Sequence, residues 1–313
     1  MSTNKIYAFY KKRWIFFSIS IILMLAGIVG VYINGVHLDI QFKGGALLKY
    51  TYVGEINDIT ASDAASTLLN RPVTTQTTVD LTSSEKRLVV NIAGNYGLDA
   101  YDQQKLDDAL KANFPDAQLS LSESSMVEPF FGHRFLRNGI IAILLSSLLV
   151  MIYVWIRFNR MGGLSAGVMA LIALLHDVLI VFFTCVLFKI AIGDAFIAVA
   201  LSIIGYSIND TIVIYDRIRE NSRTYPKLPV DTITDLSISQ SMSRSINTNI
   251  AVLISVSLIY ILAFAHTIES IQSFALPMAI GSISGCYSTI CIAGPLWVMW
   301  KKRKSVSKAV MND

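Results

Sequence analysis

The segment IGYSINDTIVIYDRIREN, residues 204–221, places polar and charged side chains inside an apolar run that begins near Ala195. On a helix, Asp210 would lie ~22 Å from that start, given ~1.5 Å of rise per residue. That depth falls well within a hydrocarbon core ~30 Å thick. An ionised carboxylate there costs ~2.5–3.5 kcal/mol on insertion scales. We therefore expect a membrane bundle that supplies Asp210 with a partner, a hydrated cavity or a function.

The composition favours a multi-spanning membrane protein. The 313 residues are 53% hydrophobic and only 15% charged, which is too apolar for an ordinary soluble domain. The net charge of +4 is concentrated in short clusters beside apolar runs, a pattern that fits membrane topology and argues against nucleic-acid binding. All three cysteines lie in apolar runs, so a disulfide framework is not expected in the polar part of the chain. We expect no bound cofactor or metal.

Six apolar runs are long enough to cross a bilayer. Lys and Arg cluster before the first run, between the second and third, after the fourth and after the sixth, whereas the short turns on the other side carry only Lys189. Cytoplasmic segments carry an excess of these residues. We therefore expect a multi-pass protein of the cytoplasmic membrane with both termini in the cytoplasm. The runs are about 14–36, 138–156, 163–188, 195–215, 242–265 and 273–300.

The predicted organisation has four parts, and the first run is too long for a cleaved signal sequence. Residues 1–37 form a cytoplasmic start and an anchoring span. Residues 38–133 form an extracytoplasmic domain. Residues 134–300 form the remaining five spans, with a cytoplasmic loop at about 217–241, and residues 301–313 form a cytoplasmic tail.

The extracytoplasmic residues predict a small α+β domain of ferredoxin-like type, with the order βαββαβ. A capping-box pattern of Thr60 and Asp63 predicts the start of its first helix, and Asp99 caps the second. The domain shows no catalytic triad, glycine-rich phosphate loop or metal-spaced His and Cys, so we expect a binding or lever domain and no enzyme. The predicted strands cover 44–53, 72–80, 86–93 and 117–121, and the helices cover 60–70 and 99–114.

The strongest candidate for ion transfer is Asp210, because burial favours the neutral form of a carboxylate. Ser207 and Asn209 make its surroundings polar. Arg244, at the cytoplasmic start of the fifth run, is a candidate counter-ion. The alternatives are a structural Asp210 bonded to neighbouring helices and an Arg244 that extends to the lipid headgroups.

A second ionisable pair, His176 and Asp177, interrupts the third run near its middle. A His beside an Asp resembles a proton relay. Neighbouring residues on a helix point about 100° apart, which argues against a ligand pair. The alternative is a packing and hydrogen-bonding role between helices, and the sequence leaves both open.

Several segments together resemble the SecF branch of the SecD/SecF family of protein-export membrane proteins. The stretch 205–221 is similar to the fourth-span signature of that branch, and 176–180, 243–248 and 281–296 resemble its third-, fifth- and sixth-span motifs. The junction after the first span resembles a family element, with Gln41 where an Asp is usual. That coupling junction comprises Asp39, Gln41, Gly44 and Gly45.

The resemblance implies a bundle of the resistance–nodulation–division (RND) type, with Asp210 and Arg244 as the pair on the proton path. It implies a subunit that works with SecD and the SecYEG channel, with YajC as a further candidate partner. It also implies use of the proton-motive force to help unfolded polypeptides leave the channel. The alternatives are half of an RND-type small-molecule efflux transporter and a non-catalytic scaffold. Sodium is an alternative coupling ion.

Overall fold

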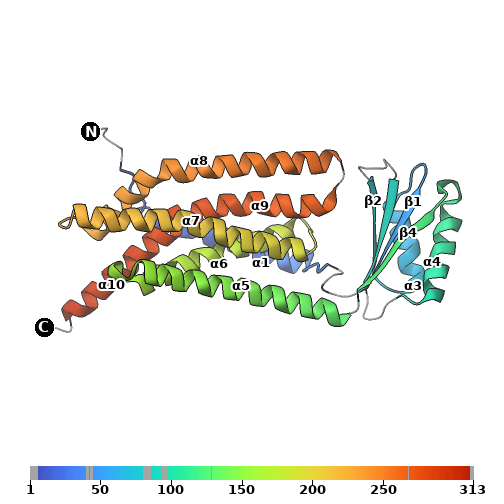
Figure 1. Cartoon of the computed structure of the whole chain (residues 1–313), viewed down its shortest axis with the longest axis horizontal. Helices are drawn as coiled ribbons and strands as arrows, with labels where there is room; N and C mark the ends of the chain where they lie inside the picture. The colour runs from blue at the N-terminus through green and yellow to red at the C-terminus, as the bar shows by residue number, and fades with distance from the viewer. Residues whose placement is uncertain are drawn as a thin grey trace.

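The computed structural model describes residues 6–39, 42, 45–79, 86–93, 98–127, 129–266 and 268–310. Figure 1 shows a long helical bundle with a small α/β domain at one end. Six helical segments of the described chain are long and apolar enough to cross a membrane, which confirms the predicted number of spans. The bundle comprises α1 (Arg13–Asn34), α5 (Pro129–Arg157), α6 (Gly163–Leu187), α7 (Asp194–Thr224), α8 (Val230–Ala265) and α9 (Glu269–Ser288), which continues through a π-helical turn (Thr289–Ala293) into α10 (Gly294–Val310).

The region expected to be a loop at about 217–241 is mostly helical. Helix α7 runs to Thr224 and α8 begins at Val230, so only a short turn separates them. Hydrogen bonds between side chains hold the two antiparallel helices together in this region. Asn221 Nδ2 donates to Ser237 Oγ at 2.9 Å, and Arg217 Nε donates to Gln240 Oε1 at 2.7 Å. These bonds add to apolar packing in the same region, where Ile218 of α7 and Ile233 and Ile238 of α8 are buried.

The small domain has the predicted order of elements. Its four antiparallel strands lie in the order β2-β3-β1-β4, as in ferredoxin-like sandwiches. Alternate residues of β1 and one stripe of each helix enter a single apolar core, which includes Leu48, Tyr50, Ala61 and Leu106. The elements are β1 (Gly45–Tyr52), α3 (Asp58–Leu69), β2 (Val73–Val79), β3 (Lys86–Ala93), α4 (Ala100–Asn113) and β4 (Ser120–Val127).

Two local predictions in this domain are wrong. The cap of α3 is Asn57, whose side-chain oxygen accepts hydrogen bonds from the backbone N–H groups of Ile59 and Thr60. An extended Asn satisfies these first-turn donors directly, so the Thr60–Asp63 capping box is not needed. The last strand begins at Ser120 because a 3₁₀ turn at Pro115–Ala117 occupies the residues where it was expected to start.

Two glycines of α9 allow the helices to approach closely at the centre of the bundle. A Cβ atom on Gly281 would lie 2.7 Å from Val181 Cγ2 and 2.8 Å from Ile203 Cγ1, and a Cβ atom on Gly285 would lie 3.1 Å from Ser207 Cβ. Small residues at such positions let helix backbones approach each other in a membrane. Helix α9 therefore packs tightly against α6 and α7, and its polar side chains reach both.

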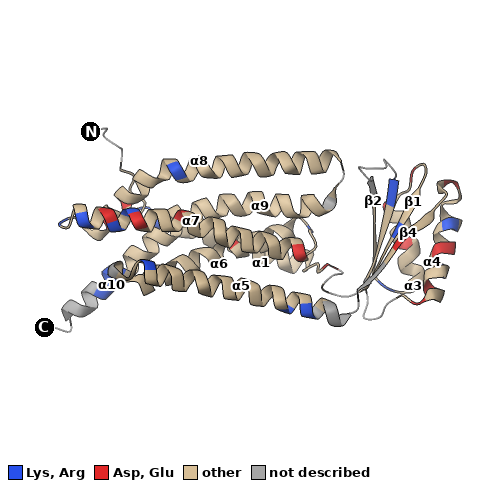
Figure 2. Ribbon diagram, viewed as in Figure 1, with Lys and Arg blue, Asp and Glu red and all other residues tan. Residues whose placement is uncertain are grey.

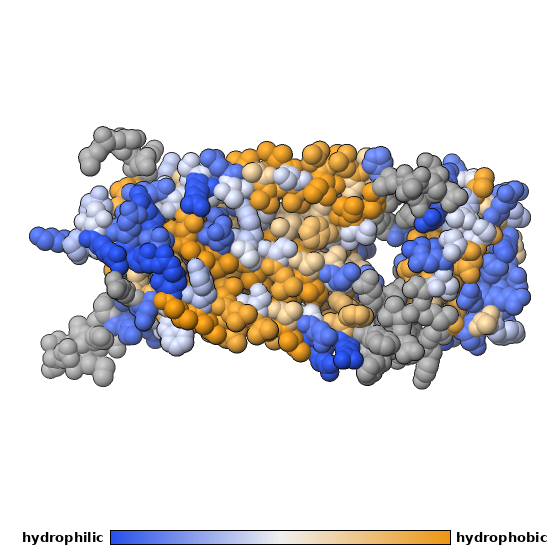
Figure 3. All heavy atoms as spheres, viewed as in Figure 1, coloured by the Kyte–Doolittle hydropathy of each residue, from blue (hydrophilic) through white to orange (hydrophobic). Residues whose placement is uncertain are grey.

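The outer surface of the bundle is apolar. Figure 3 shows a band of hydrophobic surface around the helices, with hydrophilic surface at the end remote from the sandwich. Large side chains on α5 and α8 are exposed there because lipid chains solvate them in place of protein. They include Leu144, Leu148, Ile156, Ile254, Leu258 and Phe264.

Candidate ion-transfer site in the helix bundle

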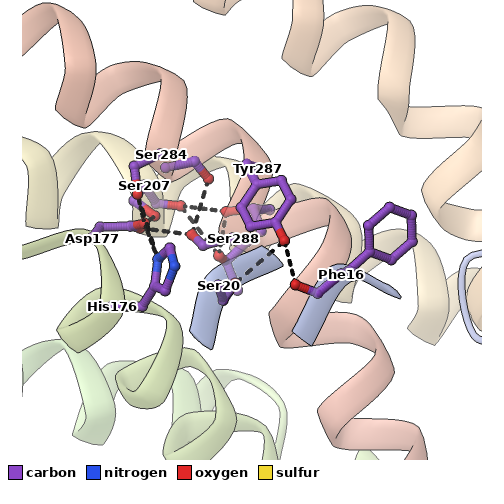
Figure 4. Close-up of polar contacts among 11 residues, drawn as sticks. Phe16, Ser20, His176, Asp177, Ser207, Ser284, Tyr287 and Ser288 are labelled. Carbon is purple, nitrogen blue, oxygen red and sulfur yellow. Dashed lines mark hydrogen bonds and ion pairs between the residues drawn. The ribbon is translucent and has the colours of Figure 1, made fainter. Parts of the chain in front are cut away.

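Asp177 on α6 lies at the centre of a hydrogen-bond network in which both of its carboxylate oxygens accept (Figure 4). Its carboxylate is fully buried. Ser284 Oγ donates to Oδ1 at 2.6 Å, whereas Ser207 and Ser288 donate to Oδ2 at 2.8 and 2.7 Å. His176 Nδ1 lies 3.2 Å from Oδ1, so the two neighbouring side chains turn toward each other despite their helical spacing. The carboxylate thus joins α6, α7 and α9.

The network extends to α1 through Tyr287. The Tyr287 ring lies beside the His176 ring, with centroids 6.1 Å apart. Its hydroxyl donates to the Phe16 carbonyl oxygen at 2.6 Å and lies 3.3 Å from Ser20 Oγ. Four helices therefore meet around Asp177: α6, α7 and α9 through hydrogen bonds to its carboxylate, and α1 through Tyr287, which packs against His176. This arrangement favours the structural interpretation of the His176–Asp177 pair.

Asp210 on α7 has the opposite character. It is 4% exposed, and its Oδ2 atom has no hydrogen-bond partner among the described residues. The Tyr206 hydroxyl, one turn earlier on α7, is also buried and unpaired within that part of the chain. The same holds for Ser245 Oγ and Asn249 Nδ2 on α8. Buried polar atoms normally have partners, and unpaired groups of this kind take up water or an ion.

These four unpaired groups belong to one seam between α7 and α8. The bonds from Arg217 to Gln240 and from Asn221 to Ser237 set the antiparallel register of the two helices. Continued toward the sandwich, that register brings Asp210 level with the part of α8 between Ser245 and Asn249. Ser245 and Tyr206 both interact with Asp210. We call these residues the α7–α8 seam: Tyr206, Asp210, Ser245 and Asn249.

Two of the predicted site residues are exposed and do not belong to the buried seam. Asn209 is exposed, because it is rotated about 100° from Asp210 around α7. Arg244 is also exposed and forms no ion pair with any described residue, although its charge acts on Asp210 from a distance. The charge pair of Asp210 and Arg244 is thus not closed in this structure, and its role in ion transfer stays a prediction.

Two more predicted residues have clear positions. Ser207 lies in the Asp177 network and not beside the Asp210 carboxylate. Sequence reasoning missed Tyr206, Ser245 and Asn249. For Ser245 and Asn249 the sequence holds a signal, a stripe of polar residues at four-residue spacing on α8. The stripe comprises Ser237, Ser241, Ser245 and Asn249, all of which are buried.

The coupling junction contacts the start of α7. The Asp39 N–H donates to the Ile192 carbonyl oxygen at 3.0 Å, and the Ile192 N–H donates to the His37 carbonyl oxygen at 2.7 Å. A Cβ atom on Gly193 would lie 2.9 Å from Asp39 Cβ. Gly45 begins β1. Gln41 and Gly44 lie outside the described residues.

The junction is also anchored by Phe42, which is 3% exposed and packs with Cys185 and Ile192. The segment that leads from α1 into the sandwich is therefore bonded to the residues that precede α7. Since α7 carries Asp210, the structure connects the candidate ion site to the sandwich through a single helix.

The fold and its buried carboxylates define a class: a multi-pass membrane protein with ionisable groups between its helices and a ferredoxin-like domain at one end of the bundle. Residues 105–303 match the family described as "Protein export membrane protein SecD/SecF, C-terminal". The chain belongs to the SecD/SecF family and is an accessory subunit of the Sec protein translocase. The efflux-transporter alternative is not favoured.

Individual relatives agree with this assignment. The chain is 33% identical to the protein translocase subunit SecF of Alicyclobacillus acidocaldarius, over 96% of this chain and 94% of that protein. It is 31% identical to the SecDF subunit of Brucella abortus, over 93% of this chain and 37% of that longer protein. The crystal structure of SecDF from Thermus thermophilus, 25% identical, covers 96% of this chain with a TM-score of 0.77; the match spans 40% of that structure. The SecDF relatives support SecD as a partner.

Proposed function

We propose that this subunit, together with SecD, uses the proton-motive force to promote protein export across the cytoplasmic membrane. The observation that carries the proposal is the contrast between two buried carboxylates. Asp177 accepts hydrogen bonds at both oxygens, whereas Asp210 keeps an unpaired oxygen in a polar seam. A carboxylate with an unpaired oxygen can gain and lose a proton without dismantling a network.

The distribution of charge supports an orientation for the protein. Figure 2 shows Lys and Arg gathered on α7 and α10 at the end of the bundle remote from the sandwich. Because positive residues favour the cytoplasmic side, that end lies in the cytoplasm and the sandwich lies outside. Helix α1 begins and α10 ends at the same side (Figure 1), so both termini are cytoplasmic.

In the proposed cycle, a proton enters from the outer side along the α7–α8 seam and neutralises Asp210. Neutralisation weakens the attraction between Asp210 and the charge of Arg244, which changes the position of α7 relative to α8. Because the segment around Asp39 is bonded to Ile192, movement of α7 reaches the sandwich. Each charge that crosses 100 mV supplies ~2.3 kcal/mol, enough to bias such a movement.

The proposed partners are SecD within the bilayer, the SecYEG channel and the unfolded polypeptide that leaves it, with YajC as a further candidate. No cofactor takes part besides the transferred ion. A proton is the proposed ion because an ionised Asp210 is costly inside the bundle and a bound proton removes its charge without further ligands. Sodium would need the carboxylate, hydroxyl and amide oxygens of the seam as its ligands. Sodium remains the alternative that the following measurement separates.

The coupling ion is tested in membrane vesicles that contain SecYEG, SecD and this subunit. We expect a proton ionophore to lower export to the rate of vesicles that lack this subunit, and collapse of a sodium gradient to leave export unchanged. Vesicles without the subunit report the effect of the ionophore on other steps of export. The reverse pattern, with sensitivity to sodium alone, would contradict proton coupling.

The link between α7 and the sandwich is tested by Gly193→Ala. The new Cβ atom would overlap Asp39, and such overpacking typically costs ~1–3 kcal/mol. We expect a several-fold loss of export stimulation in the vesicles, with normal assembly with SecD. Gly205→Ala is the matched control, since a Cβ atom there meets no atom of the described residues within 4 Å. Full stimulation by the Gly193 variant would show that this contact does not transmit the movement.

A further inference from the structure

A groove lies at the end of the bundle remote from the sandwich, between the turn that joins α5 to α6 and the middle of α10. Its volume is about 700 Å³, within the range of small-molecule sites. Most of its surface is apolar, but two lysines reach it from α10. It is lined by Trp155, Asn159, Gly162, Gly163, Leu164, Ser165, Val168, Met169, Trp300, Lys301 and Lys304.

The positive charge in this groove is not neutralised by the described part of the chain. Neither Lys301 nor Lys304 forms an ion pair there, and their ammonium groups are close enough to repel each other. The intervening Lys302 is different, because its Nζ atom lies 2.9 Å from Asp231 Oδ2. Two like charges held together favour an anion between them.

Lys301 also lies close to the N-terminal end of α6, which adds to the positive charge in the groove. Its Nζ atom lies 5.3 Å from the centre of the Trp297 ring and 3.8 Å from the position that a Cβ atom on Gly162 would take. Gly162 is the residue before α6, and no side chain of the described residues caps the first N–H groups of that helix. The lysine ammonium therefore lies against the positive end of a long helix, an arrangement that a bound anion would stabilise.

The remaining lining of the groove suits a hydrocarbon chain. Trp155 and Trp300 are each about half exposed, at 46% and 50%, and Leu164 is 55% exposed beside them. Tryptophan is enriched where a membrane meets water. The groove thus combines a cationic end with an apolar wall at the boundary of the bilayer.

We propose that this groove binds an anionic phospholipid. Its phosphate lies between Lys301, Lys304 and the first N–H groups of α6, and an acyl chain packs against Trp155, Leu164 and Val168. Basic pockets between membrane helices select anionic headgroups through this combination of charge and apolar surface. The lipid would bridge α6 and α10, two segments of the bundle that are distant in sequence.

The test uses the tryptophans in the groove as reporters. The full chain carrying Trp14→Phe, which removes an exposed reporter on α1, is reconstituted in vesicles of equal parts phosphatidylglycerol and phosphatidylcholine. Bromine atoms on the acyl chains of one lipid or the other quench nearby tryptophan fluorescence. We expect stronger quenching when phosphatidylglycerol carries the bromine. In Lys301→Gln/Lys304→Gln, the preference for phosphatidylglycerol should fall by about fivefold for each lysine removed.

The control variant Lys227→Gln/Arg303→Gln removes the same charge from exposed positions outside the groove, and it should keep the preference. The variant Lys301→Arg/Lys304→Arg should keep it as well. Equal quenching by both lipids in the parent protein, or an unchanged preference in the Lys301 and Lys304 glutamine variant, would overturn the proposal. Loss of the preference on addition of inorganic phosphate would also overturn it, since a soluble anion would then be the ligand.

Discussion

Replacement of Asp210 by Asn is expected to reduce proton-dependent stimulation of export to the level of vesicles that lack this subunit. Asparagine has nearly the same shape but cannot take up a proton, so the ion is no longer transferred at the seam. One charge that crosses 100 mV supplies ~2.3 kcal/mol, a factor of about 50 in an equilibrium. The measurement compares export with and without an ionophore, together with recovery of the complex with SecD.

The structure also predicts that this variant folds. Asp210 Oδ2 has no hydrogen-bond partner among the described residues, so an uncharged amide loses little and avoids the cost of a buried charge. We therefore expect a change in the free energy of unfolding below about 1 kcal/mol. Stimulation that persists and stays sensitive to the ionophore would remove Asp210 from the proton path. Failure to assemble with SecD would show a structural role instead.

Replacement of Asp177 by Ala is expected to lower the free energy of unfolding of the bundle by about 2–5 kcal/mol. The variant leaves the hydroxyls of Ser207, Ser284 and Ser288 without their acceptor, at a fully buried position where three helices meet. Each hydrogen bond in a membrane protein contributes ~0.6 kcal/mol on average, and unpaired buried groups add to the loss. Unfolding in mixed detergent micelles measures the change.

Asp177→Asn is the matched variant, because its amide oxygen still accepts from serine hydroxyls. It should lose less stability than the alanine variant. If Asp177→Asn keeps normal stability but abolishes ionophore-sensitive export, Asp177 belongs to the proton path, as its position in the third span first suggested. Reduced stability with retained proton coupling supports the structural role.

The sequence was sufficient for the architecture because the architecture follows from periodicity and hydropathy. Six apolar runs predicted six spans, and alternation of apolar residues along 44–53 predicted β1 with Ala46, Leu48 and Tyr50 in the core. The cap at Asp99 is confirmed by its hydrogen bond from the Asp102 N–H at 2.7 Å. The sequence pattern predicted the wrong start for α3, because Asn57 and Thr60 can both cap a helix and the structure uses Asn57.

In the candidate site, residues that are neighbours in sequence are not neighbours in space. Asn209 and Arg244 are close to the important positions in sequence, but both are exposed, whereas Tyr206, Ser245 and Asn249 carry unpaired buried groups. A helix turns each successive side chain by about 100°, so the buried neighbour of a residue is found three or four positions away or on another helix.

By itself, the sequence determined that the chain crosses a membrane six times, carries a ferredoxin-like domain and holds two carboxylates within apolar spans. Backbone polar groups inside a bilayer must be hydrogen-bonded within the protein, so long apolar runs form helices that span it. Only the tertiary structure decided which carboxylate is saturated and which is unpaired. That difference depends on the rotation and register of α6, α7, α8 and α9, which place three serines around Asp177 and leave Asp210 Oδ2 unpaired among the described residues.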